Sequence, residues 1–372
     1  MDEIKLTPEE ATARLRRGGF VLCMDVPAER EIGCDCVMWQ VGAKFQGLKM
    51  IPPGIHLLVY EAGHGSRIAE FVAINAGDVI VRRWDPVQED IAPNSGFPED
   101  QVERLVHGVR NNDFDGSMGP YPVNMEKLWA RSAGFITLEN LTRAGVPPGT
   151  RILPGDPDED ERQKKEGAIA PYFADQGRVA RFTPLWPGAP AEATGSQRRR
   201  VDGMSAAEVT AFNMDSSARL LAVIEQHCGG NWQLLIGEFQ LAFALFSMVS
   251  SMAAFQQWRD VLQLFCMCDE ALATHPHMFH AFMETLRVHM EHIPEDFFAD
   301  ELAAENFLRP LLARHLANIR AAAGPAASRG KQAAGTAANE PSLPNLARKA
   351  TQLRKYILKK YNLDLAEEEE GE

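Results

Sequence analysis

The stretch that decides the fold is residues 19–60, which read GFVLCMDVPAEREIGCDCVMWQVGAKFQGLKMIPPGIHLLVY. Short apolar runs alternate there with turn residues such as Pro27-Ala28, Gly42 and Pro52-Pro53-Gly54. Several short strands at regular spacing, with no helix-length segment between them, predict an antiparallel sandwich or barrel and disfavour a parallel βαβ sheet. The predicted strands, including two beyond the stretch, are residues 20–26, 37–41, 45–51, 55–60, 68–74 and 79–84.

Other elements are predicted on both sides of these strands. Thr7-Pro8-Glu9-Glu10 is a helix start with a capping box, and Gly18-Gly19 ends that helix. Residues 145–165 are rich in Pro, Gly, Asp and Glu, which predicts an exposed loop. The remaining predictions are helices at 98–110 and 125–135, a turn or extended segment at 118–122, and one more strand at 178–186.

The second half of the chain has helical periodicity. Ser205-Ala206-Ala207-Glu208 is a second capping box, and apolar residues then recur at i, i+3, i+4 and i+7. The turns between the runs are short, which predicts an antiparallel helical bundle or stacked array. The predicted helical runs are 209–227, 232–248, 253–273, 278–290, 295–305, 307–319 and a basic amphipathic helix at 343–361.

These patterns together predict an α+β fold, in which an N-terminal antiparallel β-sandwich-like domain precedes an all-α helical C-terminal domain. Composition adds a flexible segment, because residues 321–342 are rich in Ala and Gly. The predicted parts are a β-rich domain at 1–186, a linker at 187–204, a helical domain at 205–320, the flexible segment at 321–342, and a terminal basic helix and tail at 343–372.

Charge and hydropathy narrow the function classes. The 372 residues carry a formal net charge of −13, which disfavours direct RNA or DNA binding. The most hydrophobic window, residues 234–249, contains Glu238 and Gln240 and is short for a membrane span, so we expect a buried core helix. The first residues are polar and unlike a signal peptide, so we expect a cytoplasmic protein, with the nucleus as a second compartment.

The cysteines and histidines offer only weak signals for a site. Cys34/Cys36 and Cys266/Cys268 are each spaced by one residue, which suits neither a disulfide nor the usual zinc spacing. We interpret the first pair as same-face residues of a strand, the second as part of a helical run, and both as buried reduced thiols. Five histidines gather in the helical half, where two i,i+3 pairs could face a metal or simply lie at helix ends: His275, His277, His280, His289 and His292.

Motifs for catalysis are missing from the sequence. It contains no phosphate-binding glycine loop, no G-x-S-x-G elbow and no H-E-x-x-H. Gly63-His64-Gly65-Ser66 places a histidine beside a serine, but such a lone adjacency is more typical of a hairpin tip. We therefore predict a protein that binds other proteins and is not an enzyme, with no catalytic residue, no cofactor and no bound metal.

One set of motifs is specific to a family. The chain resembles the splicing factors of the Aar type, which are assembly factors of the U5 small nuclear ribonucleoprotein (U5 snRNP). Three pieces of residues 19–60 carry the resemblance: Asp25-Val26-Pro27, Trp39–Gly47 and Lys49–His56. Similar pieces follow in the family's order: Arg83-Trp84, Gly119–Pro122, Trp129, Phe135-Ile136, Arg181-Phe182, Gly237–Phe243, Trp258, Ile293–Phe298 and Lys359–Leu365.

The resemblance implies a partner and a mode of binding. A member of this family would bind the large central U5 scaffold protein through its RNase-H-like and Jab/MPN-like domains during U5 snRNP assembly, and would exclude the U5 helicase until maturation. It implies a non-catalytic assembly chaperone of mRNA splicing that does not bind RNA directly. The family's C-terminal tail can add a strand to the partner's sheet, which points to partner-binding residues Asn362, Leu363, Asp364 and Leu365. A frayed tail is the alternative for these four residues, and a metal hydrolase or an RNA-binding module is the alternative for the whole chain.

Overall fold

The computed structural model describes residues 6–92, 95–154, 179–185, 215–295, 308–327 and 341–365. These residues belong to two compact units, and each is described by itself. The first unit comprises residues 1–182 and 241–255, and the second comprises residues 183–240 and 256–372. The predicted linker at 187–204, the capping box at Ser205–Glu208 and the predicted helix at 295–305, except Glu295, lie outside the described residues.

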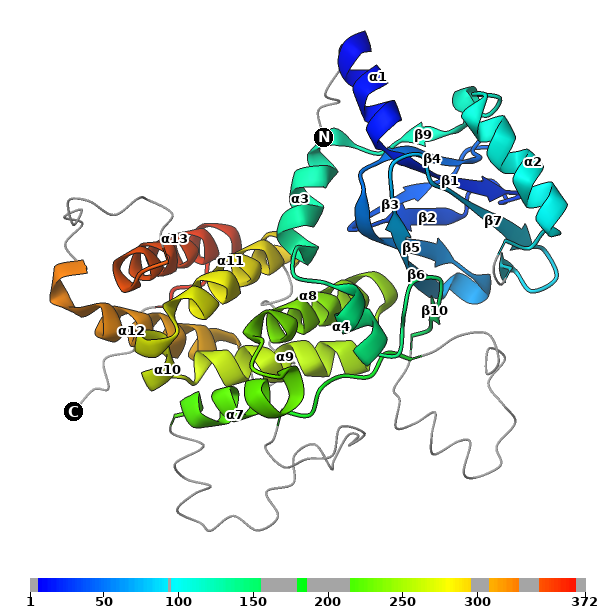
Figure 1. Ribbon diagram of the computed structural model, residues 1–372. Coiled ribbons are helices and arrows are strands. Elements are labelled where there is room, and N and C mark those ends of the chain that lie inside the picture. Colours follow the sequence, from blue (N-terminus) through cyan, green and yellow to red (C-terminus); the bar gives the residue numbers. More distant parts are fainter. Residues whose placement is uncertain are drawn as a thin grey trace, which may run out of the picture. The chain divides into compact units, whose positions relative to one another are not determined.

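The first unit contains two five-stranded sheets, shown in blue to cyan in Figure 1 except for β10, which is green. One has the strand order β8-β7-β1-β4-β9 and the other β10-β6-β5-β2-β3. The strands are β1 Gly19–Met24, β2 Glu31–Cys34, β3 Val37–Gln40, β4 Gly47–Ile51, β5 Gly54–Glu61, β6 Arg67–Ile74, β7 Val79–Asp85, β8 Asp90–Ile91, β9 Gly119–Pro120 and β10 Arg151–Ile152.

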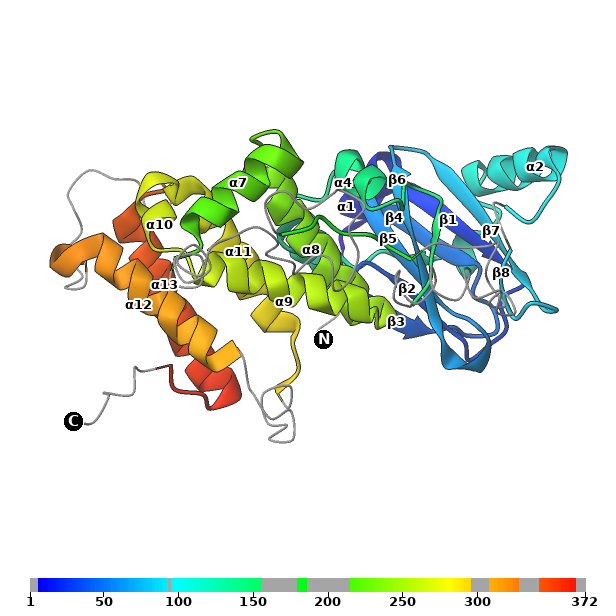
Figure 2. The same ribbon diagram turned by 90° about the horizontal axis from the view of Figure 1, so that it is seen from below.

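Strand β1 shows why the sequence is apolar almost without interruption at Gly19–Met24. Val21 and Cys23 point into the core between the sheets, together with Ile32 and Leu58 from the second sheet. Leu22 points to the opposite face, where it packs with helix α2, Glu99–Arg110. Side chains alternate across a strand, so a strand buried on both faces reads as a continuous apolar run. Helix α2 lies along β7 in Figures 1 and 2.

The predicted antiparallel arrangement holds for most of the strand pairings, but two pairings are parallel. Strand β1 pairs with β7 in parallel, from Phe20↔Val79 to Met24↔Arg83, and β4 pairs in parallel with β9. Between β1 and β7, the long connection that parallel neighbours require runs through β2 to β6, most of which belong to the second sheet, and it contains no α-helix. The second sheet is antiparallel throughout its described pairings.

The prediction that Cys34 and Cys36 lie on the same face of one strand is also wrong. Strand β2 ends at Cys34, and Asp35-Cys36 form a two-residue turn into β3. Asp35 has φ 60°, a left-handed conformation that Asp tolerates better than most residues. The cysteines therefore lie at the tip of a hairpin and not on one face of one strand. Gly63–Gly65 form the short 3-10 turn η1 between β5 and β6, at the predicted hairpin tip.

Short helices and connections complete the first unit. Helix α1, Pro8–Arg17, has the predicted capping box, since Thr7 and Glu10 bond each other's backbone. Residues 179–185 form no strand. The Arg181 N–H donates to the Ala144 carbonyl within the first unit, and the Thr183 N–H donates to the Glu238 carboxylate within the second unit. The predicted loop at 145–165 contains the strand β10, and its residues 155–165 lie outside the described part. The other elements are η2 Asp115–Ser117, α3 Val123–Ala133 and α4 Leu138–Arg143.

The helical second half confirms the predicted order of a β-rich region followed by helices. Its helices are α7 Ser217–Cys228, α8 Trp232–Val249, α9 Met252–Cys266, α10 Glu270–Thr274, α11 Pro276–His292, α12 Leu308–Ala327 and α13 Leu343–Tyr361. By length and composition α8 could cross a membrane, but 78% of its 18-residue window is buried in protein, as in a core helix. Helix α12 is kinked at Gly324, where the backbone has φ 70° and ψ 172° and is not helical.

One predicted helix, residues 253–273, is two helices in the structure. Helix α9 ends at Cys266 and α10 begins at Glu270. The Asp215 carboxylate accepts hydrogen bonds from the backbone N–H groups of Asp269 and Glu270 at 3.1 and 3.3 Å. These bonds satisfy amides at the start of α10 that have no partner within the helix. Because the capping residue is distant in sequence, local periodicity could not reveal the break.

Candidate functional site

The four predicted partner-binding residues follow the end of helix α13. Asn362 has φ 53° and ψ 31°, the left-handed conformation that ends many helices, and the chain then leaves the helix. Asn362 and Asp364 are exposed, Leu363 is half-buried, and Leu365 is completely buried. This alternation is typical of an extended segment with one face on protein. The structure places Asp364 in contact with Arg354 of α13 and assigns residues 362–365 no strand.

The tail leaves from a firmly anchored helix end. The Lys360 ammonium donates to the carbonyls of Met290, Glu291 and Ile293 at 3.0, 2.9 and 2.6 Å. The Tyr361 hydroxyl donates to the carbonyls of Met290 and Ile293 at 2.5 and 2.9 Å. The last carbonyls of a helix have no intrahelical partner and carry partial negative charge, so a cation there is favourable. Lys360 and Tyr361 thus join the end of α13 to the end of α11.

Helix α13 has one packed face and one polar face. Leu346, Leu353 and Ile357 are buried, and α13 packs beside α11 and α12 in Figure 1. At the polar edge, Lys349 forms an ion pair with Glu284 of α11. The guanidinium of Arg287 lies 3.2 Å from the centre of the Tyr356 ring, a cation–π contact. The packed face fixes where residues 362–365 begin.

The tail itself runs back along α13. Arg354 lies about two turns before the end of the helix, and its guanidinium donates to the Asp364 carboxylate at 3.0 Å. This contact and the burial of Leu365 hold the segment on its own unit. To add a strand to another sheet, the segment would have to give up the Leu365 contact. The arrangement is therefore a short non-helical segment that follows an anchored helix end, and such a segment could open into an added strand.

A second cluster is buried in the first unit, around Asp35. Its carboxylate accepts hydrogen bonds from the Tyr121 hydroxyl, from His56 Nδ1 at 2.9 Å and from the Leu57 N–H at 3.0 Å. His56 Nε2 lies 2.8 Å from the Pro52 carbonyl, which can only accept, so His56 donates from both nitrogens and is an imidazolium. Burial alone lowers the pKa of His56, but the hydrogen bond and charge of Asp35 outweigh it and raise the pKa above 6.5.

This cluster also has the composition of a metal site. Cys34, Asp35 and His56 each offer a ligand atom, and these atoms lie within 4.8 Å of one another. A ligand histidine needs a free ring nitrogen, and a ligand cysteine must lose its proton. Both nitrogens of His56 donate to protein oxygens, and burial raises the pKa of the Cys34 thiol well above its ordinary value. The cluster is best explained as a structural network that holds the hairpin tip.

The network gathers residues from three of the family-like pieces. His56 ends the Lys49–His56 piece, and Tyr121 belongs to Gly119–Pro122. Trp129 donates from Nε1 to the Ile55 carbonyl at 2.7 Å, next to His56. The sequence did not single out Asp35, because an acidic residue in a turn is usually solvated. Only the pairing of β2 with β5 places it beside His56.

The other predicted candidates do not assemble into a site among the described residues. His289 is buried and accepts from Trp258 Nε1 at 3.1 Å, while His280 Nε2 lies 3.1 Å from the Ser342 carbonyl. Within the described ranges the bundle histidines form no group of three metal ligands. All six cysteines are free, and burial raises the pKa of Cys23, Cys36 and Cys268 to about 12. The prediction of reduced thiols agrees with this geometry.

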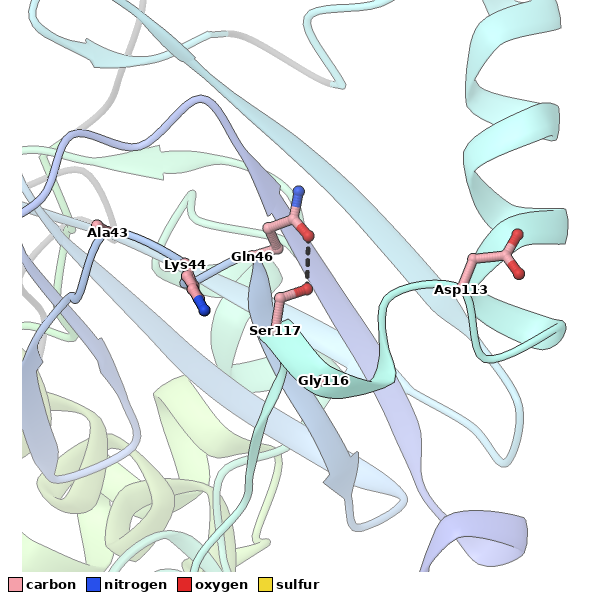
Figure 3. Close-up of a pocket in the computed structure, with 6 residues that line it drawn as sticks. All are labelled: Ala43, Lys44, Gln46, Asp113, Gly116 and Ser117. Carbon is pink, nitrogen blue, oxygen red and sulfur yellow. Dashed lines mark hydrogen bonds between the residues drawn. The ribbon is translucent and has the colours of Figure 1, made fainter.

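A shallow depression of about 450 Å³ lies on the first unit, beside η2 (Figure 3). Ser117 Oγ donates to Gln46 Oε1 at 2.5 Å, and the Gln46 N–H donates to the Ser117 carbonyl at 2.9 Å. Figure 3 shows Asp113 apart from Lys44 and pointing away from it. Small-molecule sites are usually mostly apolar with a few converging polar groups, whereas this depression is shallow and lined mainly by polar residues and glycine. Its lining residues are Ala43, Lys44, Gln46, Asp113, Gly116 and Ser117.

Comparison with known proteins identifies both halves of the chain. Residues 17–146 match the AAR2 N-terminal domain, and residues 194–366 match the AAR2 C-terminal repeat region. Protein AAR2 homolog of Mus musculus is 30% identical over 333 residues, which cover 84% of this chain and 85% of the relative. Protein AAR2 homolog of Caenorhabditis elegans is 28% identical over 343 residues, or 85% and 90% of the two chains. The human homolog is 28% identical over 333 residues, or 84% and 85%. The chain therefore belongs to the AAR2 family, the splicing-related family that its sequence resembles.

Proposed function

We propose that this chain is a non-catalytic pre-mRNA splicing factor that binds the large U5 scaffold protein during U5 snRNP assembly. It engages the RNase-H-like and Jab/MPN-like domains of that protein and blocks premature binding of the helicase. It acts without cofactor and without direct RNA contact, in the cytoplasm and also in the nucleus. Family membership over most of the chain supports the proposal.

The observation that carries the proposal is the state of residues 362–365. They lie outside the helix, alternate between more exposed and more buried side chains, and follow a helix end that is anchored by five hydrogen bonds from Lys360 and Tyr361. An extended peptide can add to a sheet edge through main-chain hydrogen bonds, with pockets for alternate side chains. A rigid anchor lowers the entropy that such a segment loses on binding.

The test uses two proline variants of the full chain, Leu363→Pro and Asp364→Pro. In an added strand the N–H groups of neighbouring residues point to opposite edges, so only one of the two faces the partner's sheet. Proline removes one N–H, and it is tolerated where that N–H faces away from the ladder. We expect one variant to lose at least tenfold in affinity for the purified RNase-H-like or Jab/MPN-like domain, and the other to bind nearly as the natural chain does.

Three outcomes would count against the proposal. Equal affinity of both variants and of a chain ending at Tyr361 would remove the tail from the interface. Failure of the natural chain to recover any U5 component from cell extract would remove the partner itself. Stoichiometric metal in the purified protein, or RNA affinity with a steep salt dependence, would instead favour the hydrolase or RNA-binding alternative.

A further inference from the structure

Helix α13 presents a basic surface on a strongly acidic chain. Its exposed residues include Arg348, Lys355 and Lys359, which lie within one broad helical face because they are separated by about two turns and one turn. Among the described carboxylates none forms an ion pair with Lys355 or Lys359, whereas Lys349 pairs with Glu284 and Arg354 with Asp364. Leu358, 44% exposed, lies on the same side of the helix. We call Arg348, Lys355 and Lys359 the basic face.

The direction of the chain after α13 decides what reaches this face first. The left-handed Asn362 ends the helix, and Asp364 then meets Arg354, ten residues earlier. The chain has therefore reversed and runs antiparallel to α13, toward the beginning of the helix. Leu365 is buried, so the segment is held down at that point.

The residues that follow are acidic. Residues 366–372 read AEEEEGE, with five glutamates. Extended at about 3.4 Å per residue they could reach about 24 Å. The basic face between residues 348 and 359 is about 17 Å long at 1.5 Å per residue. The negative charge of this segment, the direction in which the chain enters it and its length therefore all suit the basic face.

We propose that the acidic end of the chain, residues 367–372, docks on the basic face of α13 in the free protein. The contact is electrostatic and made by several weak exposed pairs, each of which is screened by salt. Because the tether keeps the glutamates close, their local concentration is high and an acidic surface in trans must compete with them. The proposal concerns the free chain and does not depend on the partner proposed above.

The experiment places a nitroxide spin label on the full chain at Gly371→Cys and measures the paramagnetic broadening of α13 amides. Labelling can be selective, because five of the six natural cysteines are buried and burial raises the pKa of the sixth, Cys36, to about 12. We expect the amides of residues 348–355 to broaden at about 20 mM NaCl. We expect the broadening to fall at least threefold at about 500 mM NaCl, where the Debye length is only about 4 Å.

The covalent link alone keeps the spin label near residue 365 and can broaden nearby amides. Charge variants distinguish this effect from docking on the basic face. Lys355→Gln with Lys359→Gln should reduce the broadening as strongly as salt does. A matched control removes two exposed lysines elsewhere, Lys44→Gln with Lys127→Gln, and should leave it unchanged. Lys355→Glu and Lys359→Glu combined with Glu368→Lys and Glu369→Lys should restore it.

Broadening that ignores salt and all charge variants would overturn the proposal. A second result would also overturn it: the amides of the basic face are not broadened by the label, and they shift only when an oligoglutamate peptide is added. The basic face would then bind an acidic partner in trans and not residues 367–372 of the same chain.

Discussion

His56 and His315 are both buried histidines, yet their surroundings push their protonation in opposite directions. His56 donates to Asp35 and Pro52, and its charge is neutralised by the carboxylate. His315 of helix α12 lies between Phe279 and Phe282, and neither ring nitrogen has a hydrogen-bond partner among the described residues. Burial lowers the pKa of His315 to about 3. The first histidine is held charged and the second is held neutral.

Replacing His56 by Gln should destabilise the first unit by about 3 kcal/mol, because a buried carboxylate loses its charged partner. The natural chain gains full stability from His56 below pH 6.5 and loses this contribution as pH rises through the raised pKa of the folded state. In the variant that loss should disappear. Amide exchange at Leu57, whose N–H bonds Asp35, measures the effect at several pH values. An unchanged pH dependence in the variant would show that His56 is not the titrating group.

Replacing His315 by Leu should stabilise the second unit by about 1–2 kcal/mol, since a buried polar group without partners is removed. A depressed pKa means that the unfolded chain binds protons first, so the natural stability falls as pH drops from 6.5 toward 3. The variant should lose less stability over that range in urea titrations. The exposed His277→Leu serves as the control and should change neither value by more than about 0.5 kcal/mol. A destabilised His315→Leu protein would mean that the site needs the imidazole.

At the scale of elements, the join between α11 and α13 is the feature that organises the C-terminal part. Three carbonyls at the end of α11 receive the Lys360 ammonium, and two of them also receive the Tyr361 hydroxyl. Periodicity predicted both helices but not this contact, because the residues lie about seventy positions apart. Local sequence shows only that Lys360 is a cation near the end of its own helix, where it would also be favourable.

Lys360→Met should cost about 1–2 kcal/mol, because the aliphatic stem remains while the carbonyls lose a charged donor. Lys359→Met is the matched control, because Lys359 is the next residue in the sequence and its side chain is exposed. We expect faster amide exchange in the last turn of α11 and the first residues after α13 for Lys360→Met alone. If both variants behave alike, the ammonium does not cap α11 and the tail anchor rests on packing.

At the scale of the whole molecule, the predicted order of a β-rich region and then helices is correct, but the compact units do not follow chain order. Residues 241–255, which contain the second half of α8 and the start of α9, group with the β-rich unit. Sequence composition suggested a boundary at 187–204, where Pro, Gly and Arg accumulate. A boundary inside a continuous apolar helix gives no change in composition. Helical periodicity shows that one face of the helix is buried, but it does not show which element covers that face.

Sequence patterns alone were enough to predict most of the strands and helices, the capping box at Thr7 and the family. These properties depend on local dihedral preferences, on side-chain period and on motif order, all of which are written along the chain. The parallel pairing of β1 with β7, the break before α10, the charge on His56 and the burial of Leu365 became visible only in the folded structure. Each of these depends on a partner distant in sequence, and the free energy of a hydrogen bond or of burial depends on which partner the fold supplies.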